Sequence, residues 1–373
     1  MSSALPNSTD VFVVGGGPAG LAAAIAARQR GLRVVLADGA HPPIDKPCGE
    51  GLMAEGIEAL RRLGINLESD DAYAFSGMRF LAAGMAVDAQ FPSLGHGLGV
   101  RRTTLHRIMT QRAVEAGVEL FWGNVITGLS VEGVTLGDRT IGARWIIGAD
   151  GANSRVRRWA GLDSYVRNDL RYAFRRHYRV APWTNRVEIH WGPRGQIYVT
   201  PVTNDQVGVA LISRDPKLRL KKALLDFPAL NARLHRAKIQ SSEKGALSTT
   251  RKLKRVCRGN VALIGDASGT VDAITGEGLC LSFRQALALA DCIESDNIDR
   301  YRVEHRCLSR RPLLMARLLL ALDGRPRLQE RVLHVFSKRP DIFRELLALH
   351  VGALSSFRLA LNGLTLGWGM LTA

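Results

Sequence analysis

The 373-residue sequence lacks paired cysteines. Its five cysteines are scattered, and none stands in a C-x-x-C pair or beside a histidine at metal-ligand spacing. A structural metal site and a disulfide framework are therefore not expected, and this cysteine usage favours a reducing cytosol. The N-terminal stretch MSSALPNSTD has no apolar core, so a secretory signal is not expected either. Internal repeats, low-complexity tracts and long linkers are also missing.

The sequence also lacks nucleic-acid-binding motifs, although it is strongly basic. Its formal net charge is +17, but it contains no helix-turn-helix, zinc finger or aromatic RNA-binding strand. The arginines are dense between Arg300 and Arg344, where acids and leucine-rich runs separate them. Such basic helices fit an anionic membrane surface or an acidic substrate at least as well. We therefore expect a cytoplasmic protein without a nucleic-acid partner, and peripheral membrane contact through the C-terminal helices stays open.

Residues 346–371 form an apolar stretch that is long enough to span a membrane. His350, Arg358 and Asn362 interrupt this stretch, and several glycines punctuate it. We therefore expect a packed or surface-bound helical tail at this end of the chain.

The first forty residues contain the pattern of a complete β-α-β unit. The apolar run DVFVV (10–14) predicts a buried strand, and an alanine-rich helix is expected over 21–29. A second strand is expected over 33–37, which ends at Asp38. The chain therefore begins with the unit that binds dinucleotides in many folds.

The segment GGGPAG between strand and helix carries the spacing G-x-G-x-x-G. Gly15 permits a tight turn, Gly17 lets a pyrophosphate approach the backbone, and Gly20 lets helix and strand pack closely. The start of the helix, with Pro18 and Ala19, offers free N–H groups to phosphate. Asp38 is placed to accept hydrogen bonds from an adenosine ribose. Together these residues predict dinucleotide binding.

Further strands and helices follow the first unit after an interruption. Buried strands are expected near 98, over 118–123, over 143–151 and over 260–269, with helices over 104–116 and 277–293. The segments RVEIHW, GQIYVTPV and QVGVALI alternate in the β pattern and predict a separate sheet. Within them we interpret His190 as a polar sheet position, like His177 before them, while Trp191 and Tyr198 fit packing or a pocket.

Two later segments, GADGANSRVR (148–157) and GDASGTVDAITGEGL (265–279), together with VRRTTLHRIM (100–109), resemble signatures of the flavoprotein hydroxylases and geranylgeranyl reductases. The resemblance implies an α/β fold with a glutathione-reductase-like Rossmann FAD domain, an inserted mixed β-sheet substrate domain and a helical C-terminal tail. The FAD domain is expected to comprise residues 1–55, 98–162 and 250–295. The substrate domain would comprise 56–97 and 163–249, and the helical region 296–373.

The resemblance also implies roles for single residues. Asp266 would bond the ribityl chain of FAD, Asp150 would lie near the pyrophosphate, and Arg102 would contact phosphate or ribityl. Val125 would meet the adenine through its backbone. The start of the last helix would lie under the flavin ring, where about half a positive charge stabilises reduced flavin. The simpler interpretation of TGEG is a capping turn with Thr275 as the N-cap. The expected cofactor contacts are Gly15, Gly17, Pro18, Ala19, Gly20, Asp38, Cys48, Gly49, Gly51, Arg102, Val125, Asp150, Asp266, Gly276, Gly278 and Leu279.

The segment DKPCGEGL (45–52) resembles the P-C-G-G loop that passes beside the isoalloxazine ring in geranylgeranyl reductases. Gly49 and Gly51 would let the backbone pass the ring, and Cys48 would lie near the reaction centre. The alternative is a glycine turn with a small buried cysteine. Glu50 is the one acid within the sequence KPCGEGL, and it fits either a proton relay or an ion pair with Lys46. Cys48 and Glu50 are therefore the flavin-facing candidates, and no catalytic acid or base is assigned.

Three functions fit these residues. The first is an NAD(P)H-dependent monooxygenase that uses C4a-hydroperoxyflavin to hydroxylate or epoxidise a lipophilic phenolic, polyketide-like or isoprenoid molecule. FAD would be the resident cofactor, with NADH or NADPH as the transient reductant. The second is a geranylgeranyl-reductase-like enzyme that reduces isoprenoid double bonds. The third is a non-catalytic flavin-binding protein associated with membrane or nucleic acid.

Overall fold

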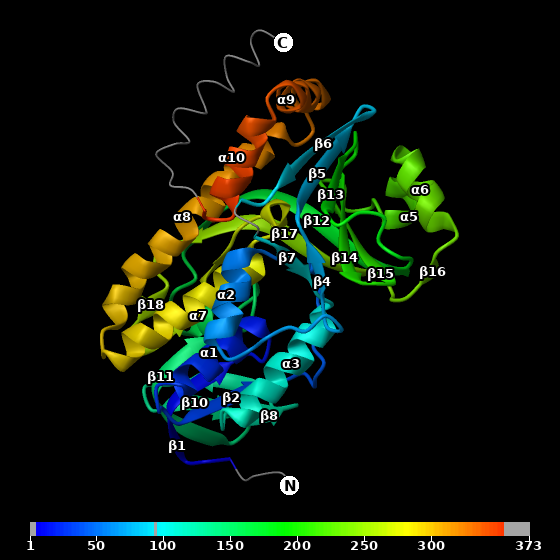
Figure 1. Cartoon of the computed structure of the whole chain (residues 1–373). Helices are drawn as coiled ribbons and strands as arrows, with labels where there is room; N and C mark the ends of the chain where they lie inside the picture. The colour runs from blue at the N-terminus through cyan, green and yellow to red at the C-terminus, as the bar shows by residue number, and fades with distance from the viewer. Residues whose placement is uncertain (1–4, 93–94, 354–373) are drawn as a thin grey trace.

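The computed structural model describes residues 5–92 and 95–353 of the chain. Two large sheets make up much of the described chain, and the C-terminal helices lead from beside the first sheet to the edge of the second (Figure 1). The expected fold class, a Rossmann-like domain with an inserted sheet domain and C-terminal helices, is confirmed.

The first sheet has the order β18-β19-β11-β1-β2-β8, and its central strands run parallel. β1 (Ser8–Val14) lies in the middle, and α1 (Pro18–Arg28) leads from it to β2 (Val34–Asp38). The alanines of α1 are buried against α7 (Gly278–Glu294), because small side chains permit close helix packing. The other elements of this domain are α3 (Arg102–Glu115), β8 (Glu119–Trp122), β9 (Ile126–Leu129), β10 (Gly133–Leu136), β11 (Arg139–Gly148), α4 (Arg155–Trp159), β18 (Cys257–Arg258), β19 (Val261–Leu263) and η2 (Gly265–Ser268).

The second sheet has the order β20-β17-β12-β15-β14-β13-β5-β6 and is antiparallel except between β13 and β5. The short helices α5 (Leu220–Ala223), η1 (Leu224–Asp226) and α6 (Pro228–His235) cover one of its faces with a small separate core. Its strands are β5 (Gly77–Ala82), β6 (Met85–Gln90), β12 (Tyr165–Arg179), β13 (Val187–Trp191), β14 (Gln196–Thr203), β15 (Gln206–Ser213), β16 (Lys238–Ile239), β17 (Lys244–Leu253) and β20 (Gly269–Thr270).

A third, three-stranded sheet and the C-terminal helices complete the described chain. The small sheet joins β3 (Gly51–Leu52), β7 (Gly97–Gly99) and β4 (Tyr73–Phe75), with α2 (Ala54–Arg62) following β3. α8 (Ile298–Leu322) starts beside α7, and α9 (Pro326–Lys338) and α10 (Pro340–His350) pack near β5 and β6 (Figure 1). η3 (Ala273–Thr275) lies against α8.

The elements agree with the sequence expectations apart from details at their ends. The strand expected near residue 98 is β7, but it pairs with β3 and β4 and does not join the parallel sheet. α1 begins at Pro18, three residues earlier than expected, since proline is well suited to the first helical position. The expectation that Thr275 caps α7 is wrong: Thr275 belongs to η3, and Glu277 is the N-cap.

No helix within residues 5–92 and 95–353 is long and apolar enough to cross a membrane. Most of the expected helical tail, residues 354–371, lies outside the described residues, and only its first residues belong to α10.

Candidate active site

The three motif glycines of the loop between β1 and α1 have different surroundings. Gly15 has a φ of +109°, and a Cβ there would lie 2.6 Å from the carbonyl oxygen of Ala149. A Cβ on Gly20 would lie 1.8 Å from the carbonyl oxygen of Gly15, so both positions require glycine. A Cβ on Gly17 would meet only a terminal nitrogen of Arg102, 3.9 Å away. Gly17 therefore presents bare backbone to the open side of the loop.

Asp38 at the end of β2 holds this loop in place. Its carboxylate accepts hydrogen bonds from the backbone N–H of Gly16 at 2.7 Å and of Ala40 at 2.8 Å. His106 of α3 adds a contact from Nε2 to the carbonyl oxygen of Gly16 at 2.9 Å. Burial lowers the pKa of His106, so the ring is neutral and its Nε2–H donates to that carbonyl. Sequence reasoning missed His106, which is separated from the loop by 90 residues.

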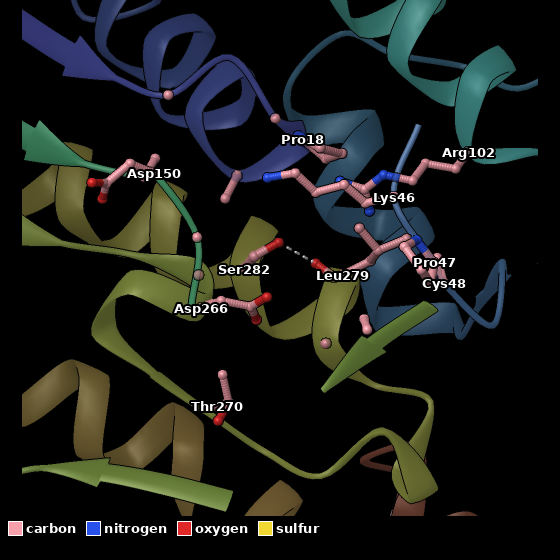
Figure 2. Close-up of a pocket in the computed structure, with 18 of the residues that line it drawn as sticks. Pro18, Lys46, Pro47, Cys48, Arg102, Asp150, Asp266, Thr270, Leu279 and Ser282 are labelled. Atoms are coloured by element: carbon pink, nitrogen blue, oxygen red, sulfur yellow. Dashed lines mark hydrogen bonds between the residues drawn. The ribbon is translucent and has the colours of Figure 1, made fainter. Parts of the chain in front are cut away.

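A cavity of about 430 Å³ extends from this loop to the start of α7 (Figure 2). It brings together every expected cofactor contact except Gly20, which packs inside the loop. The expected residues that line it are Gly15, Gly17, Pro18, Ala19, Asp38, Cys48, Gly49, Gly51, Arg102, Val125, Asp150, Asp266, Gly276, Gly278 and Leu279.

The charges around this cavity suit an anionic ligand with a polar chain. Lys46, Arg102 and Arg155 line the wall, and Nε of Arg102 is buried without a hydrogen-bond partner among the described residues. Asp266 faces the cavity from η2, and enclosure by the walls raises its pKa, while Arg102 and Lys46 oppose that rise. Asp150 accepts hydrogen bonds from the backbone of α4 with one oxygen and leaves the other unpartnered. These unsatisfied groups fit the phosphates and hydroxyls of a dinucleotide.

The far end of the cavity is formed by the start of α7. No side chain caps this helix, so its first N–H groups and its dipole face outward. A Cβ on Gly276 or Gly278 would meet no atom within 4 Å. The two glycines therefore leave room for a flat group against the backbone. Figure 2 shows Leu279 here, where its carbonyl oxygen accepts a hydrogen bond from Ser282 at 2.8 Å. The residues present fit FAD, whose phosphates would be held by the glycine loop and whose flavin would be held by the start of α7.

The loop at 45–52 is fixed to the second sheet by polar contacts. Thr200 of β14 donates to the carbonyl oxygen of Gly49 at 2.9 Å. Glu50 has a φ of +60°, which is unusual for a residue with a side chain, and its N–H donates to the sulfur of Cys48. The Glu50 carboxylate is 2% exposed and accepts from the backbone N–H of Arg102 at 2.9 Å. The expected alternative of an ion pair between Glu50 and Lys46 is wrong.

The second hydrogen-bond partner of the Glu50 carboxylate is His177 of β12, whose Nε2 lies 2.6 Å from Oε2 of Glu50. The guanidinium of Arg175 donates to Nδ1 of His177, so Nδ1 is an acceptor and the proton lies on Nε2. Burial lowers the pKa of His177, in keeping with this neutral ring. Arg175 also pairs with Asp45 at 2.5 Å. The contacts from Asp45 to Arg175, and from Arg175 through His177 to Glu50, therefore attach the 45–52 loop to β12. The sequence predicted only a polar sheet position for His177, and the structure shows that it also binds this loop.

A second cavity of about 370 Å³ lies between the antiparallel sheet and helices α8 to α10. Its wall is almost entirely apolar. It shares Cys48, Gly49 and Gly276 with the first cavity, so the two spaces meet at the 45–52 loop and the start of α7. Burial raises the pKa of Cys48, which keeps the thiol protonated. The apolar side chains of this wall include Met53, Met78, Phe80, Phe174, Val187, Ile189, Trp191, Ile212, Ile274, Met315, Leu318, Leu319, Leu322, Val332, Phe336, Phe343, Leu346 and Leu347.

The other sequence candidates differ in their relation to this second cavity. Trp191 and Tyr198 line it, and the hydroxyl of Tyr198 donates to the carbonyl oxygen of Ile274 at 2.9 Å. His190 lies on the other face of β13 and contacts Glu188 at 3.1 Å. Among the described residues, no group of three or more His, Cys, Asp or Glu side chains could hold a metal ion.

Two known proteins with similar sequences are named as reductases. A menaquinone reductase from Mycobacterium tuberculosis is 29% identical over 325 residues, which cover 79% of this chain and 78% of the relative. A digeranylgeranylglycerophospholipid reductase from Methanococcus vannielii is 27% identical, with 81% of both chains covered.

Solved structures at low identity share the fold. A geranylgeranyl bacteriochlorophyll reductase-like protein from Thermoplasma acidophilum superposes with a TM-score of 0.75 at 21% identity, covering 92% of this chain and 99% of the other. A probable FAD-dependent monooxygenase from Pseudomonas aeruginosa superposes with a TM-score of 0.73 at 21% identity, covering 86% and 98%.

The FAD binding domain family matches residues 8–295, which include every residue that lines the first cavity. The expected resemblance to flavoprotein hydroxylases and geranylgeranyl reductases is confirmed. The chain therefore belongs to the FAD binding domain family and is an FAD-dependent oxidoreductase.

Proposed function

We propose that the protein reduces a carbon–carbon double bond of an isoprenoid lipid. The observation that carries this proposal is the apolar cavity that opens onto the flavin end of the first cavity at Cys48, Gly49 and Gly276. A long hydrocarbon chain would gain about 25 cal/mol for each Å² of apolar surface that it buries there. The isoprenoid compounds named in the two similar reductases support the same class of substrate.

In this proposal the chain's own residues bind, orient and exclude water. Bound FAD, once reduced, would supply a hydride to one carbon of the double bond, and the proton that reduced flavin gives up as it is oxidised would go to the other carbon. The N-terminus of α7 stabilises negative charge on the cofactor, and the network from Asp45 to Glu50 fixes the loop between cofactor and substrate. Phe80, Trp191 and Phe336 enclose the substrate in an apolar, water-poor space. The protonated thiol of Cys48 lies where the two cavities meet and contributes to the wall.

β14 departs from the Y-x-W-x-F-P pattern of geranylgeranyl reductases. Its segment GQIYVTPV has Val199 and Thr200 where that pattern has a tryptophan and a phenylalanine. Thr200 lines the cavity, whereas Val199 is buried outside its lining. The prenyl specificity of those reductases is therefore not carried over to this chain.

We further propose that NADH or NADPH reduces the flavin transiently and that the basic helices contact an anionic membrane surface. Leu318 of α8 is 41% exposed and also lines the apolar cavity, so this wall reaches the molecular surface. The exposed arginines of α8 and α9 lie on the same helical layer as this opening. A lipid could therefore pass from a membrane into the cavity.

The test is anaerobic reoxidation of the reduced protein by an isoprenoid. Geranylgeraniol should restore the absorbance of oxidised flavin without oxygen and yield a product with two more hydrogens. Ala210→Phe, which fills the cavity from β15, should abolish this reoxidation while the bound FAD content stays unchanged. Ala86→Phe, on the exposed face of β6, is the matched control and should leave reoxidation intact. Reoxidation that requires oxygen and inserts an oxygen atom would instead support the monooxygenase hypothesis.

A further inference from the structure

His350 is a polar residue in the wall of the apolar cavity, and no sequence motif indicates it. It ends α10, more than 70 residues after the start of α7, and is 5% exposed. Three other polar residues of the wall direct their hydroxyl groups to backbone partners: Tyr198, Thr200 and Thr275. His350 differs, because its Nδ1 is buried without a hydrogen-bond partner among the described residues.

A carboxylate lies near that nitrogen, that of Glu277, one of whose oxygens also lacks a hydrogen-bond partner among the described residues. Nδ1 of His350 lies 3.6 Å from Oε2 of Glu277, and Oε2 is also buried without a hydrogen bond. Glu277 is the N-cap of α7 and directly follows Gly276, which lines both cavities. His350 is therefore held at the end of the apolar cavity that lies beside the flavin.

The carboxylate beside Nδ1 indicates which tautomer of the ring fits this place. Glu277 is held from behind by Arg311 at 3.5 Å, and Arg311 also bonds Glu55 at 2.9 Å. In a neutral imidazole one ring nitrogen is a donor and the other an acceptor, and the nitrogen that faces a carboxylate is the donor. The neutral ring therefore carries its proton on Nδ1, and Nε2, on the opposite side of the ring, is an acceptor for a ligand in the cavity.

We propose that His350 is a specificity-determining residue that accepts a hydrogen bond from a hydroxyl group of the substrate. This inference rests on the proposed function and narrows its substrate class to hydroxyl-bearing isoprenoids, such as prenyl alcohols or prenylated quinols. The oxygen would lie beside the start of α7, and the hydrocarbon chain would extend between the sheet and α8 to α10. A pure hydrocarbon would leave the acceptor of His350 buried and unpaired, and the cavity would bind it less well.

The experiment compares an alcohol with its methyl ether, in which a methyl group replaces the hydroxyl hydrogen and the oxygen can no longer donate a hydrogen bond. Binding of geranylgeraniol and of its methyl ether to the oxidised, FAD-loaded protein is measured by calorimetry, without turnover. The wild-type protein should bind the alcohol about tenfold more tightly than the ether, since one neutral hydrogen bond to a buried acceptor is at stake. His350→Phe should bind both ligands equally. His334→Phe, a histidine of α9 outside the cavity wall, should keep the tenfold preference.

The outcomes separate the inference from the function on which it rests. Equal binding of both ligands by the wild-type protein overturns the role of His350 and leaves the proposed function standing. A preference that persists in His350→Phe also overturns that role. Failure of both ligands to bind the wild-type protein contradicts the proposed function itself, and the role of His350 falls with it.

Discussion

The substitution Gly278→Ala separates folding from cofactor binding at the start of α7. A Cβ on Gly278 would meet no protein atom within 4 Å, and its φ lies outside the left-handed region, so the protein alone accommodates alanine. Alanine is also a better helix former than glycine, by up to about 1 kcal/mol. The added methyl group would project into the cavity where we place the flavin. Overpacking of this kind costs roughly 1–3 kcal/mol, which corresponds to about 5- to 150-fold weaker FAD binding.

The assay pairs urea unfolding of the apoprotein with an FAD titration that follows flavin fluorescence. The apoprotein of Gly278→Ala should be as stable as the wild type or slightly more stable, while its FAD affinity falls. Gly128→Ala on β9 is the control, because its Cβ would meet Thr135 at an ordinary 3.9 Å, away from the cavity wall. An unchanged FAD affinity in Gly278→Ala would refute the placement of the flavin against α7.

Three further predictions concern the contact between His177 and Glu50, the buried histidine His305 and the basic helix α9. His177→Ala should lower the free energy of unfolding by about 2–4 kcal/mol in urea titrations, because Glu50 loses a buried partner; exposed His235→Ala should have little effect. Burial lowers the pKa of His305 to about 4, whereas a histidine of the unfolded chain has a pKa of about 6.5. Between these two pH values the unfolded chain binds a proton at this histidine and the folded chain does not. The free energy of unfolding should thus fall as the pH drops from about 6.5 to 4, by on the order of 3 kcal/mol, and His305→Gln should flatten this pH dependence. Arg327→Glu with Arg331→Glu on α9 should weaken binding to phosphatidylserine vesicles, measured by co-sedimentation, by at least about 2 kcal/mol. Lys221→Glu with Lys222→Glu on α5 should not weaken this binding.

Much of the cofactor cavity could be predicted from the sequence because its residues stand in short motifs of fixed spacing. Gly15 and Gly20 are required by atoms within the same β-α turn or the adjacent strand, and Asp38 ends the next strand. A backbone that must turn sharply or approach a ligand leaves glycine at fixed spacing, and such spacing is visible in one sequence.

The substrate side could not be predicted in the same way, because it depends on contacts between distant segments. Glu50 meets His177 across 127 residues, and Glu277 meets His350 across 73. The apolar wall takes side chains from β5, β13, β14 and three C-terminal helices, each of which looks like ordinary core in the sequence. The domain bounds and the individual cofactor contacts stay predictions until the complex with FAD is measured.

The most direct test of the proposed reduction is the fate of oxygen in a single turnover. The reduced protein is mixed with geranylgeraniol in buffer that contains ¹⁸O₂, and the mass of the product is measured by mass spectrometry. The proposed reduction predicts a product that has gained two hydrogens and no ¹⁸O. A product that carries ¹⁸O would contradict it and identify the protein as a monooxygenase.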